Sequence, residues 1–370
     1  MRTIDNNTEA FLTILRAGLW EQKVRLSSLL PIDFSAIYEM AEEQSVVGLL
    51  AAGLEQVADV KVPQDVVLEI VGSALQLEQC NREMNAFIAE LVEKMRKNGI
   101  YTLLVKGQGI AQCYEKPFWR ASGDIDFLIG DDYKKAQSFL IPIAKSVEKE
   151  SGKHHGMTIG PWIVELHGNL HCGLSAKMDR SIDEVQENVF YGGNVRSWMN
   201  ENTQVFLPSA DNDIIFIFTH FLKHFYKGGL GLRQICDWCR LLWTYRNEVN
   251  VRLLEKRLRA MGLMTEWKAF GAFAVDILGM PCDAMPLYAG SNRWKRKAQR
   301  ILSFILMSGN MGHNRDRSYR NYPFLIRKVY SMGRRVGDML NHARIFPLDS
   351  LRFFSFIFLN GIKASIKGIG

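Results

Sequence analysis

The sequence predicts an α+β protein that is mostly helical, with a small α/β core between an N-terminal and a C-terminal helical region. Apolar residues recur at three- and four-residue spacing through residues 1–98 and again after residue 208, which is the period of amphipathic helices. Between these regions the pattern changes to short, nearly all-apolar runs that are typical of buried strands. The predicted units cover residues 1–84, 85–205 and 206–370.

Three helices are expected in the N-terminal unit, at residues 9–20, 33–54 and 64–97. The third ends in a group of Lys and Arg residues, which suit the negative end of a helix dipole, and Asn98-Gly99 follows as a helix stop.

The central unit is expected to combine short strands with one helix. Strands are predicted at residues 100–105 and 125–129, within 146–159, and at 161–166, with a helix at 133–140.

The C-terminal unit is expected to be helical throughout. Ser209 and Asp211 supply an N-cap for its first helix, and Pro323 fits the first turn of its last, where a missing N–H costs nothing. The predicted helices cover residues 214–226, 232–245, 251–259, 265–278, 294–307 and 322–340.

Composition excludes a disordered or fibrous chain, because 47% of the 370 residues are hydrophobic and 23% are charged. The net charge of +7 is unevenly spread. From Ser291 onward there are 16 Lys and Arg against three Asp and Glu, a net charge of +13, whereas the first 290 residues carry −6. A basic tail on an acidic body points to a polyanionic partner, either a nucleic acid or an anionic membrane surface.

A cytoplasmic location is expected. The N-terminal segment carries Asp5 and Glu9 and lacks the order of a signal peptide, and no apolar run approaches the roughly 18 residues that span a bilayer. The six cysteines are scattered among apolar neighbours, which is typical of reduced thiols.

The most informative segment is Arg-Ala-Ser-Gly-Asp-Ile-Asp at residues 120–126. Because strand side chains alternate, Asp124 and Asp126 should point to the same face. Two carboxylates there are costly to bury unless a cation lies between them, and Mg²⁺ suits oxygen ligands where phosphates supply the rest. Most isolated Asp-x-Asp pairs are instead solvated turn residues or caps.

The next strand repeats this arrangement with Glu165, and His167 lies on the same face. Three carboxylates on adjacent strands can hold two metal ions for an in-line displacement at phosphorus. The alternative for Glu165 is a strand-end acid paired with a Lys or Arg.

Upstream, the strand that ends at Lys106 runs into a turn with Gly107, Gln108 and Gly109. Such a turn places backbone N–H groups and a helix N-terminus where phosphate binds, with the Lys106 charge beside them. Turns of this kind also serve only as tight connections.

These motifs together resemble the uncharacterised bacterial nucleotidyltransferase family of the DNA polymerase β superfamily. The likeness covers about residues 100–170 and extends through 220–242. It implies a small mixed sheet with flanking helices, and two Mg²⁺ ions held by Asp124, Asp126 and Glu165. It also implies transfer of a nucleoside monophosphate from an NTP to a hydroxyl, with release of pyrophosphate. The chain departs from the superfamily at Gly107-Gln108, where Gly-Ser or Gly-Gly is usual.

His220 and His224 share one helix face, a spacing that can bind zinc, but no third ligand accompanies them. We expect His220, Lys223 or His224 to face the nucleotide, and Arg233 to pair with Asp237 on the following helix. The predicted nucleotide-binding residues are Lys106, Gly107, Gln108, Arg120, Ser122, Gly123, His167, His220, His224 and Arg233.

Three functional interpretations stay open at this stage. The first is a Mg²⁺-dependent nucleotidyltransferase whose hydroxyl acceptor is undetermined. The second is an inactive nucleotide- or nucleic-acid-binding module, and the third is the nucleotidyltransferase of a toxin–antitoxin or defence system. For the basic tail, a solvated helical face that ends in a docked helix is the simplest interpretation. Contact with nucleic acid or an anionic membrane is the functional one.

Overall fold

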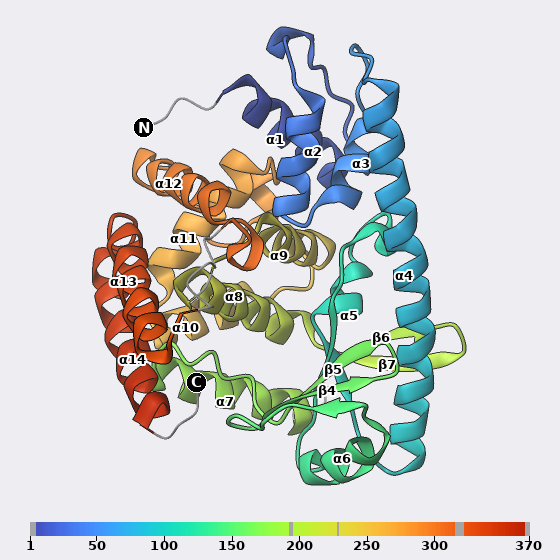
Figure 1. Cartoon of the computed structure of the whole chain (residues 1–370), viewed down its shortest axis with the longest axis vertical. Helices are drawn as coiled ribbons and strands as arrows, with labels where there is room; N and C mark the ends of the chain where they lie inside the picture. Colours follow the sequence, from blue (N-terminus) through green and yellow to red (C-terminus); the bar gives the residue numbers. More distant parts are fainter. Residues whose placement is uncertain (1–4, 192–194, 228, 315–321, 367–370) are drawn as a thin grey trace.

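The computed structural model of the chain describes residues 5–191, 195–227, 229–314 and 322–366. It is mostly helical, with one mixed five-stranded sheet and one two-stranded sheet, so the predicted fold class is confirmed. The long helix α4 (Gln64–Lys97) runs along one side of the molecule, and the C-terminal helices lie on the opposite side (Figure 1). Because α4 is continuous, it crosses the predicted boundary at residue 84.

The N-terminal region contains one more helix than predicted. Residues 33–54 form two helices, because Ser45 adopts a left-handed backbone with φ 56°. The break turns the second helix onto α1, where a Cβ at Gly18 would lie 2.1 Å from the Leu49 carbonyl oxygen. The helices before α4 are α1 (Asn6–Trp20), α2 (Phe34–Glu43) and α3 (Val47–Leu54).

The large sheet has the strand order β1-β2-β5-β4-β3, in which only β2 and β5 pair in parallel. The single strand expected within 146–159 is two strands, because Gly152 and Lys153 both adopt positive φ between them. The strands are β1 (Leu103–Val105), β2 (Asp124–Leu128), β3 (Ser146–Val147), β4 (His154–Ile159) and β5 (Trp162–His167).

One face of this sheet is covered by α4 and by α6 (Tyr133–Leu140), which was predicted at these residues. Ile125 and Phe127 of β2 pack into this apolar layer together with Val164 and Leu166 of β5. Since side chains alternate along a strand, the acidic residues of β2 and β5 point to the other face.

A helix and a hairpin are among the elements that were not predicted. Helix α7 (Ala176–Tyr191) buries Met178, Ile182 and Val185 at helical spacing, a signal that the sequence does carry. The hairpin of β6 (Val195–Asn200) and β7 (Thr203–Pro208) is harder to foresee, because only one of the six residues of β6 is buried and its apolar alternation is weak.

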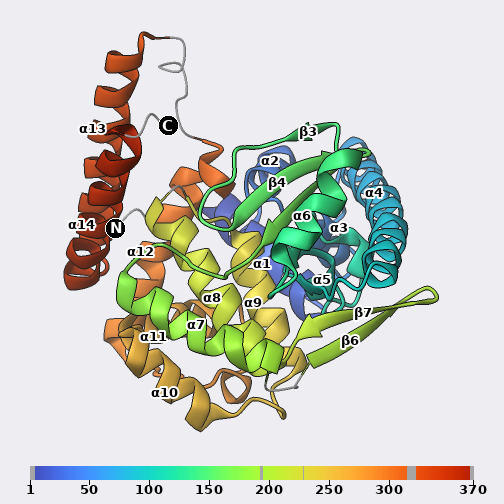
Figure 2. The ribbon, with the colours of Figure 1, turned by 90° about the horizontal axis from the view of Figure 1, so that it is seen from below.

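The remaining helices pack around the aromatic core of Phe218, Trp238, Trp267 and Phe270. Figure 2 shows α13 and α14 as a pair beside the rest of the molecule. Among the residues described, no helix has the length and apolarity that crossing a membrane requires. The helices are α8 (Ala210–Lys227), α9 (Leu232–Thr244), α10 (Val251–Met261), α11 (Met264–Ala272), α12 (Asn292–Ser308), α13 (Phe324–Ala343) and α14 (Pro347–Ile366).

Candidate active site

The parallel pairing of β2 with β5 brings the three predicted carboxylates together. Asp126 lies opposite Glu165 in the register, and Asp124 is two residues earlier on the same face. Oxygen atoms of the three carboxylates all lie within 4.8 Å of one another. Repulsion from Asp126, together with burial, raises the pKa of Asp124. The cluster is therefore a place where a positive charge is stabilised.

Two side chains of the protein already contact Asp126. Lys106 Nζ lies 2.5 Å from Asp126 Oδ1, and His167 Nε2 donates to the same oxygen at 2.7 Å. Burial opposes the charge on Lys106, yet Asp126 and Asp124 raise the pKa of this lysine. Burial likewise opposes a charge on His167, but its hydrogen bonds to Asp126 and Glu165 raise its pKa.

Glu165 has a further partner in His154 of β4, whose Nε2 donates to Glu165 Oε2 at 2.8 Å. Burial would raise the pKa of Glu165, but hydrogen bonds from His154 and His167 hold that pKa below its usual range. Glu165 is therefore ionised in the folded protein. His154, Glu165 and His167 form a second group of close ligand atoms that shares Glu165 with the carboxylate cluster.

The turn after β1 aims Lys106 at these carboxylates. Lys106 adopts φ 60° and Gly107 φ 41°, left-handed values that favour glycine and that strain a lysine. The following helix, α5 (Gly107–Ala111), is only five residues long. Gln108 lies behind the turn, fully buried, and its amide donates to Asn81 Oδ1 at 2.7 Å and Ser122 Oγ at 3.2 Å. Its side chain thus anchors the turn to α4 and to the loop before β2.

Arg120 is held by a residue that is distant in sequence. Its Nε and Nη2 donate to the two carboxylate oxygens of Asp237 at 2.8 and 2.7 Å, and both side chains are buried. Arg120 Nη1 also donates to Ser122 Oγ at 2.9 Å, so the pair orients the loop that leads into Asp124. Asp237 therefore pairs with Arg120 and not, as expected, with Arg233 on its own helix. Arg233 Nη1 instead donates to the Ala121 carbonyl at 2.9 Å.

Helix α8 supplies the opposite wall. The Nε2 atoms of His220 and His224 lie 2.9 Å apart, so one ring donates to the other. Burial lowers the pKa of His220 well below its usual value and that of His224 to about 3, and the cations Lys106 and Lys223 reinforce the effect. Both rings are therefore neutral at physiological pH. Arg233 Nε is buried without a hydrogen-bond partner among the described residues.

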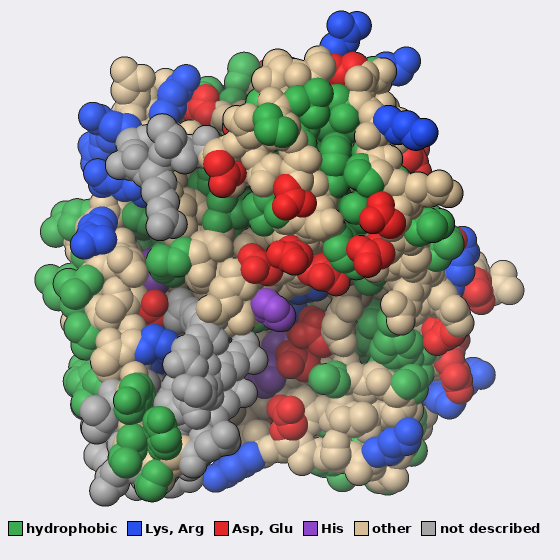
Figure 3. All heavy atoms as spheres, turned by 45° about the horizontal axis from the view of Figure 1, so that its top comes forward, with side chains coloured by type: hydrophobic (Ala, Val, Ile, Leu, Met, Phe, Trp, Pro, Cys, Tyr) green, Lys and Arg blue, Asp and Glu red, His purple; other side chains and the backbone are tan. Residues whose placement is uncertain are grey.

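A pocket separates the two walls. Figure 3 shows acidic and His side chains together around a hollow near the middle of one face. Glu165 and His167 lie next to Asp126 but do not line the pocket. Gln108 does not line the pocket either. Of the predicted site residues, those that line the pocket are Lys106, Gly107, Arg120, Ser122, Gly123, Asp124, Asp126, His220, His224 and Arg233.

Sequence reasoning did not foresee that Asp237 and Tyr114 form part of the site. Tyr114 donates its hydroxyl to Asp237 Oδ1 at 2.8 Å, which completes the support of Arg120. Asp237 is the one acid of helix α9, and this is the signal that marks it. Its partner follows only from the packing of α9 against the loop before β2.

The sequence pattern of a family described as uncharacterised nucleotidyltransferase matches residues 31–279, which include the whole pocket except Met311. The chain belongs to this family. A solved structure of an antigenic nucleotidyltransferase-like protein from Paracoccidioides brasiliensis is 12% identical, with a TM-score of 0.34. The match covers 55% of this chain and 96% of that one. No curated protein matches the chain.

Proposed function

We propose that this nucleotidyltransferase is Mg²⁺-dependent and transfers a nucleoside monophosphate from an NTP to a hydroxyl of its acceptor. The observation that carries the proposal is the pocket itself. Three carboxylates with oxygens within 4.8 Å line or support one wall, and a guanidinium and two imidazoles line the other. Sequence likeness to the DNA polymerase β superfamily supports the same chemistry.

The donor set fits magnesium. Asp124, Asp126 and Glu165 offer only hard oxygen ligands, and the repulsion that raises the Asp124 pKa is relieved by a divalent cation. When bound, Mg²⁺ would neutralise the triphosphate and activate the attacking oxygen. Asp124 and Asp126 would hold the ions, and Glu165 would complete the ligand set nearest the acceptor.

The other residues bind and orient the nucleotide. Lys106 and Arg233 supply positive charge from opposite sides of the pocket, and neutral His220 and His224 can each donate or accept one hydrogen bond. Arg120 is a positioning residue, because Asp237 occupies its guanidinium.

The proposed transfer is a displacement at the α-phosphorus of the bound NTP. The acceptor oxygen forms a bond to the α-phosphorus, and the bond from that phosphorus to the bridging oxygen of the β-phosphate breaks. Pyrophosphate leaves, and the hydroxyl proton passes to water. Glu165, which is ionised, helps to position the hydroxyl.

The proposal is tested by NTP binding, measured as a thermal shift with and without Mg²⁺. We expect a Mg²⁺-dependent rise in melting temperature that Asp126→Asn loses. The matched control is Asp183→Asn, which changes an exposed acid on α7 whose partner is His171. An equal rise in the Asp126 variant would contradict the assignment.

One observation favours the inactive binding module as a second candidate. Asp126 Oδ1 already accepts from both Lys106 and His167, so the protein supplies internal cations where a metal ion would bind. Under this alternative, NTP binding would be independent of Mg²⁺, and no pyrophosphate would be released with any hydroxyl acceptor.

A further inference from the structure

The helical hairpin of α13 and α14 has one face docked on the body and one face turned outward. On the inner side, the ring of His342 lies 4.5 Å from that of Phe225, and Phe353 lies 4.8 Å from Tyr226, both on α8. Phe346, between the two helices, is also fully buried. The hairpin is therefore held by an aromatic seam along α8.

The outward face is apolar along both helices. On α14, Leu348 is 81% exposed and Leu351 is 63% exposed, and Leu359 continues the same stripe. Their helical positions are opposite Phe353, which faces α8. On α13, the exposed large apolar residues of the same kind are Ile326, Tyr330, Met332, Val336 and Leu340.

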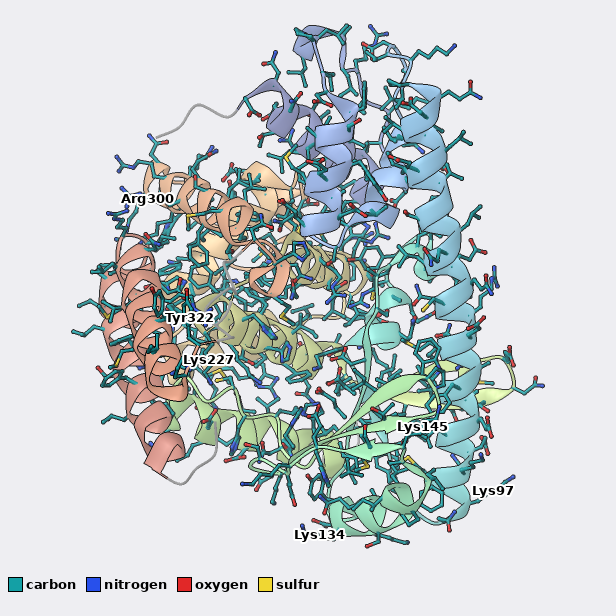
Figure 4. All side chains as sticks on the ribbon, viewed as in Figure 1. Lys97, Lys134, Lys145, Lys227, Arg300 and Tyr322 are labelled. Carbon is teal, nitrogen blue, oxygen red and sulfur yellow. The ribbon has the colours of Figure 1, made fainter. Side chains whose placement is uncertain are left out.

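The C-terminal region that carries this apolar face is rich in cations. Arg300 Nη1 donates to the Arg344 carbonyl at 2.5 Å, which joins α12 to the turn between α13 and α14. Figure 4 shows Arg300 above the upper end of α13. Arg335 lines a pocket beside Lys227 of α8 and therefore lies on the inner side of the hairpin. In the described part of residues 291–366, the two acids, Asp338 and Asp349, are partly buried, and the other exposed cations are Arg293, Lys295, Arg296, Arg300, Arg334 and Arg344.

We propose that the outward face of the α13–α14 hairpin docks on an anionic lipid surface. Its leucines would enter the interface between headgroups and acyl chains, and the surrounding Arg and Lys would contact lipid phosphates. No helix among the described residues suits a membrane span, so the hairpin lies on the surface rather than crossing it.

Two other occupants fit the face less well. A nucleic acid is bound through its phosphates, which need cations at the point of contact, whereas the outward face is formed by leucines and other apolar side chains. A second copy of the chain would bring two tails together, each with a net charge of +13 from residue 291 onward, and these repel.

The molecule offers its own control surface. Helix α4 exposes Leu68 (66%) and Leu75 (57%) on one helix face, but the charged residues of segment 64–79 are all acidic: Asp65, Glu69 and Glu78. If leucine exposure alone drove binding, both stripes would contribute. If the proposal holds, only the stripe with basic neighbours does.

The test is co-sedimentation of the full chain with vesicles of phosphatidylcholine alone, or of equimolar phosphatidylcholine and phosphatidylglycerol. We expect binding to the anionic vesicles that weakens as salt rises. Leu348→Ser/Leu351→Ser should lower the partition coefficient on the order of tenfold, because apolar burial drives interfacial binding. Leu68→Ser/Leu75→Ser should leave it unchanged. All four side chains are exposed, so the variants should fold.

Four results would overturn the proposal. One is the absence of vesicle binding at low salt, and another is equal binding by the two double variants. The third is a dimer that hides the face and dissociates on Leu348→Ser/Leu351→Ser. Salt-sensitive binding to duplex or single-stranded nucleic acid without vesicle binding would also reject it, in favour of the nucleic-acid interpretation.

Discussion

Two pairs of histidines face the candidate active site with almost the same geometry and opposite electrostatics. The rings of His154 and His167 are 4.8 Å apart at 64°, and those of His220 and His224 are 4.7 Å apart at 66°. On the sheet side, carboxylates raise the pKa of His167, whereas on the helix side burial and cations lower both values. The neighbours, rather than the pairing, decide whether a histidine carries charge.

Because of this difference, the sheet side of the pocket is an anionic wall, whereas the helix side is neutral or positively charged. The anionic wall favours a divalent cation, and the other wall can contact phosphates without excess repulsion between its own groups. A triphosphate with its metal ions has the complementary distribution of charge. The comparison therefore supports the proposed function. Substitutions that change the charge of one wall, or that break the contact between the walls, test it.

The largest expected effect comes from breaking the link between the walls. Asp237 on α9 holds Arg120 from the sheet side, and both are buried. Asp237→Ala should lower the free energy of unfolding by about 3–5 kcal/mol, because it leaves a buried guanidinium unpaired. Urea unfolding measures this. Glu255→Ala, which removes the partner of exposed Arg259, is the control, and its loss should stay below about 1 kcal/mol.

A smaller effect is expected at Lys106, the cation whose charge acts on both histidine pairs. Lys106 neutralises Asp126 and also lowers the pKa of His220 and His224. Lys106→Met should lower the free energy of unfolding by about 2–3 kcal/mol at neutral pH. This loss is somewhat smaller than that expected for a fully buried ion pair, because the pocket is open to water. Thermal unfolding should show that added Mg²⁺ stabilises this variant more than the wild type. Equal Mg²⁺ responses would argue against carboxylate repulsion in this wall.

The smallest effect concerns pH. The pKa of His224 falls from 6.5 to about 3 on folding, so between these values the unfolded chain binds a proton that the folded chain does not. Stability from this group is complete above pH 6.5 and declines as the pH falls. His224→Gln should raise the free energy of unfolding at pH 5 by up to about 2 kcal/mol, because it removes the cost of keeping this histidine unprotonated in the folded state. Melting temperatures of the two proteins at pH 7 and pH 5 give the comparison. A parallel decline in both would show that His224 is protonated in the fold.

Local periodicity was enough to predict much of the fold. The three N-terminal helical segments, the strands that carry the carboxylates, and the C-terminal helices follow from apolar spacing over one element at a time. Prediction failed where a turn interrupts a helical pattern, as at Ser45, and where a hairpin has little buried surface, as in β6. In both cases the information lies in contacts with other elements.

From the sequence alone it follows that Asp124 and Asp126 share a strand face and that Glu165 shares one with His167, because alternation is a property of the backbone. That these faces meet, and that Gln108 turns away from the pocket, depends on how the strands and helices pack together. The pairing of Arg120 with Asp237, 117 residues away, depends on the same packing. The apolar stripes of α13 and α14 are visible in the sequence, but which face packs on α8 and which meets solvent is not. Such choices depend on packing between distant segments, which a local pattern does not encode.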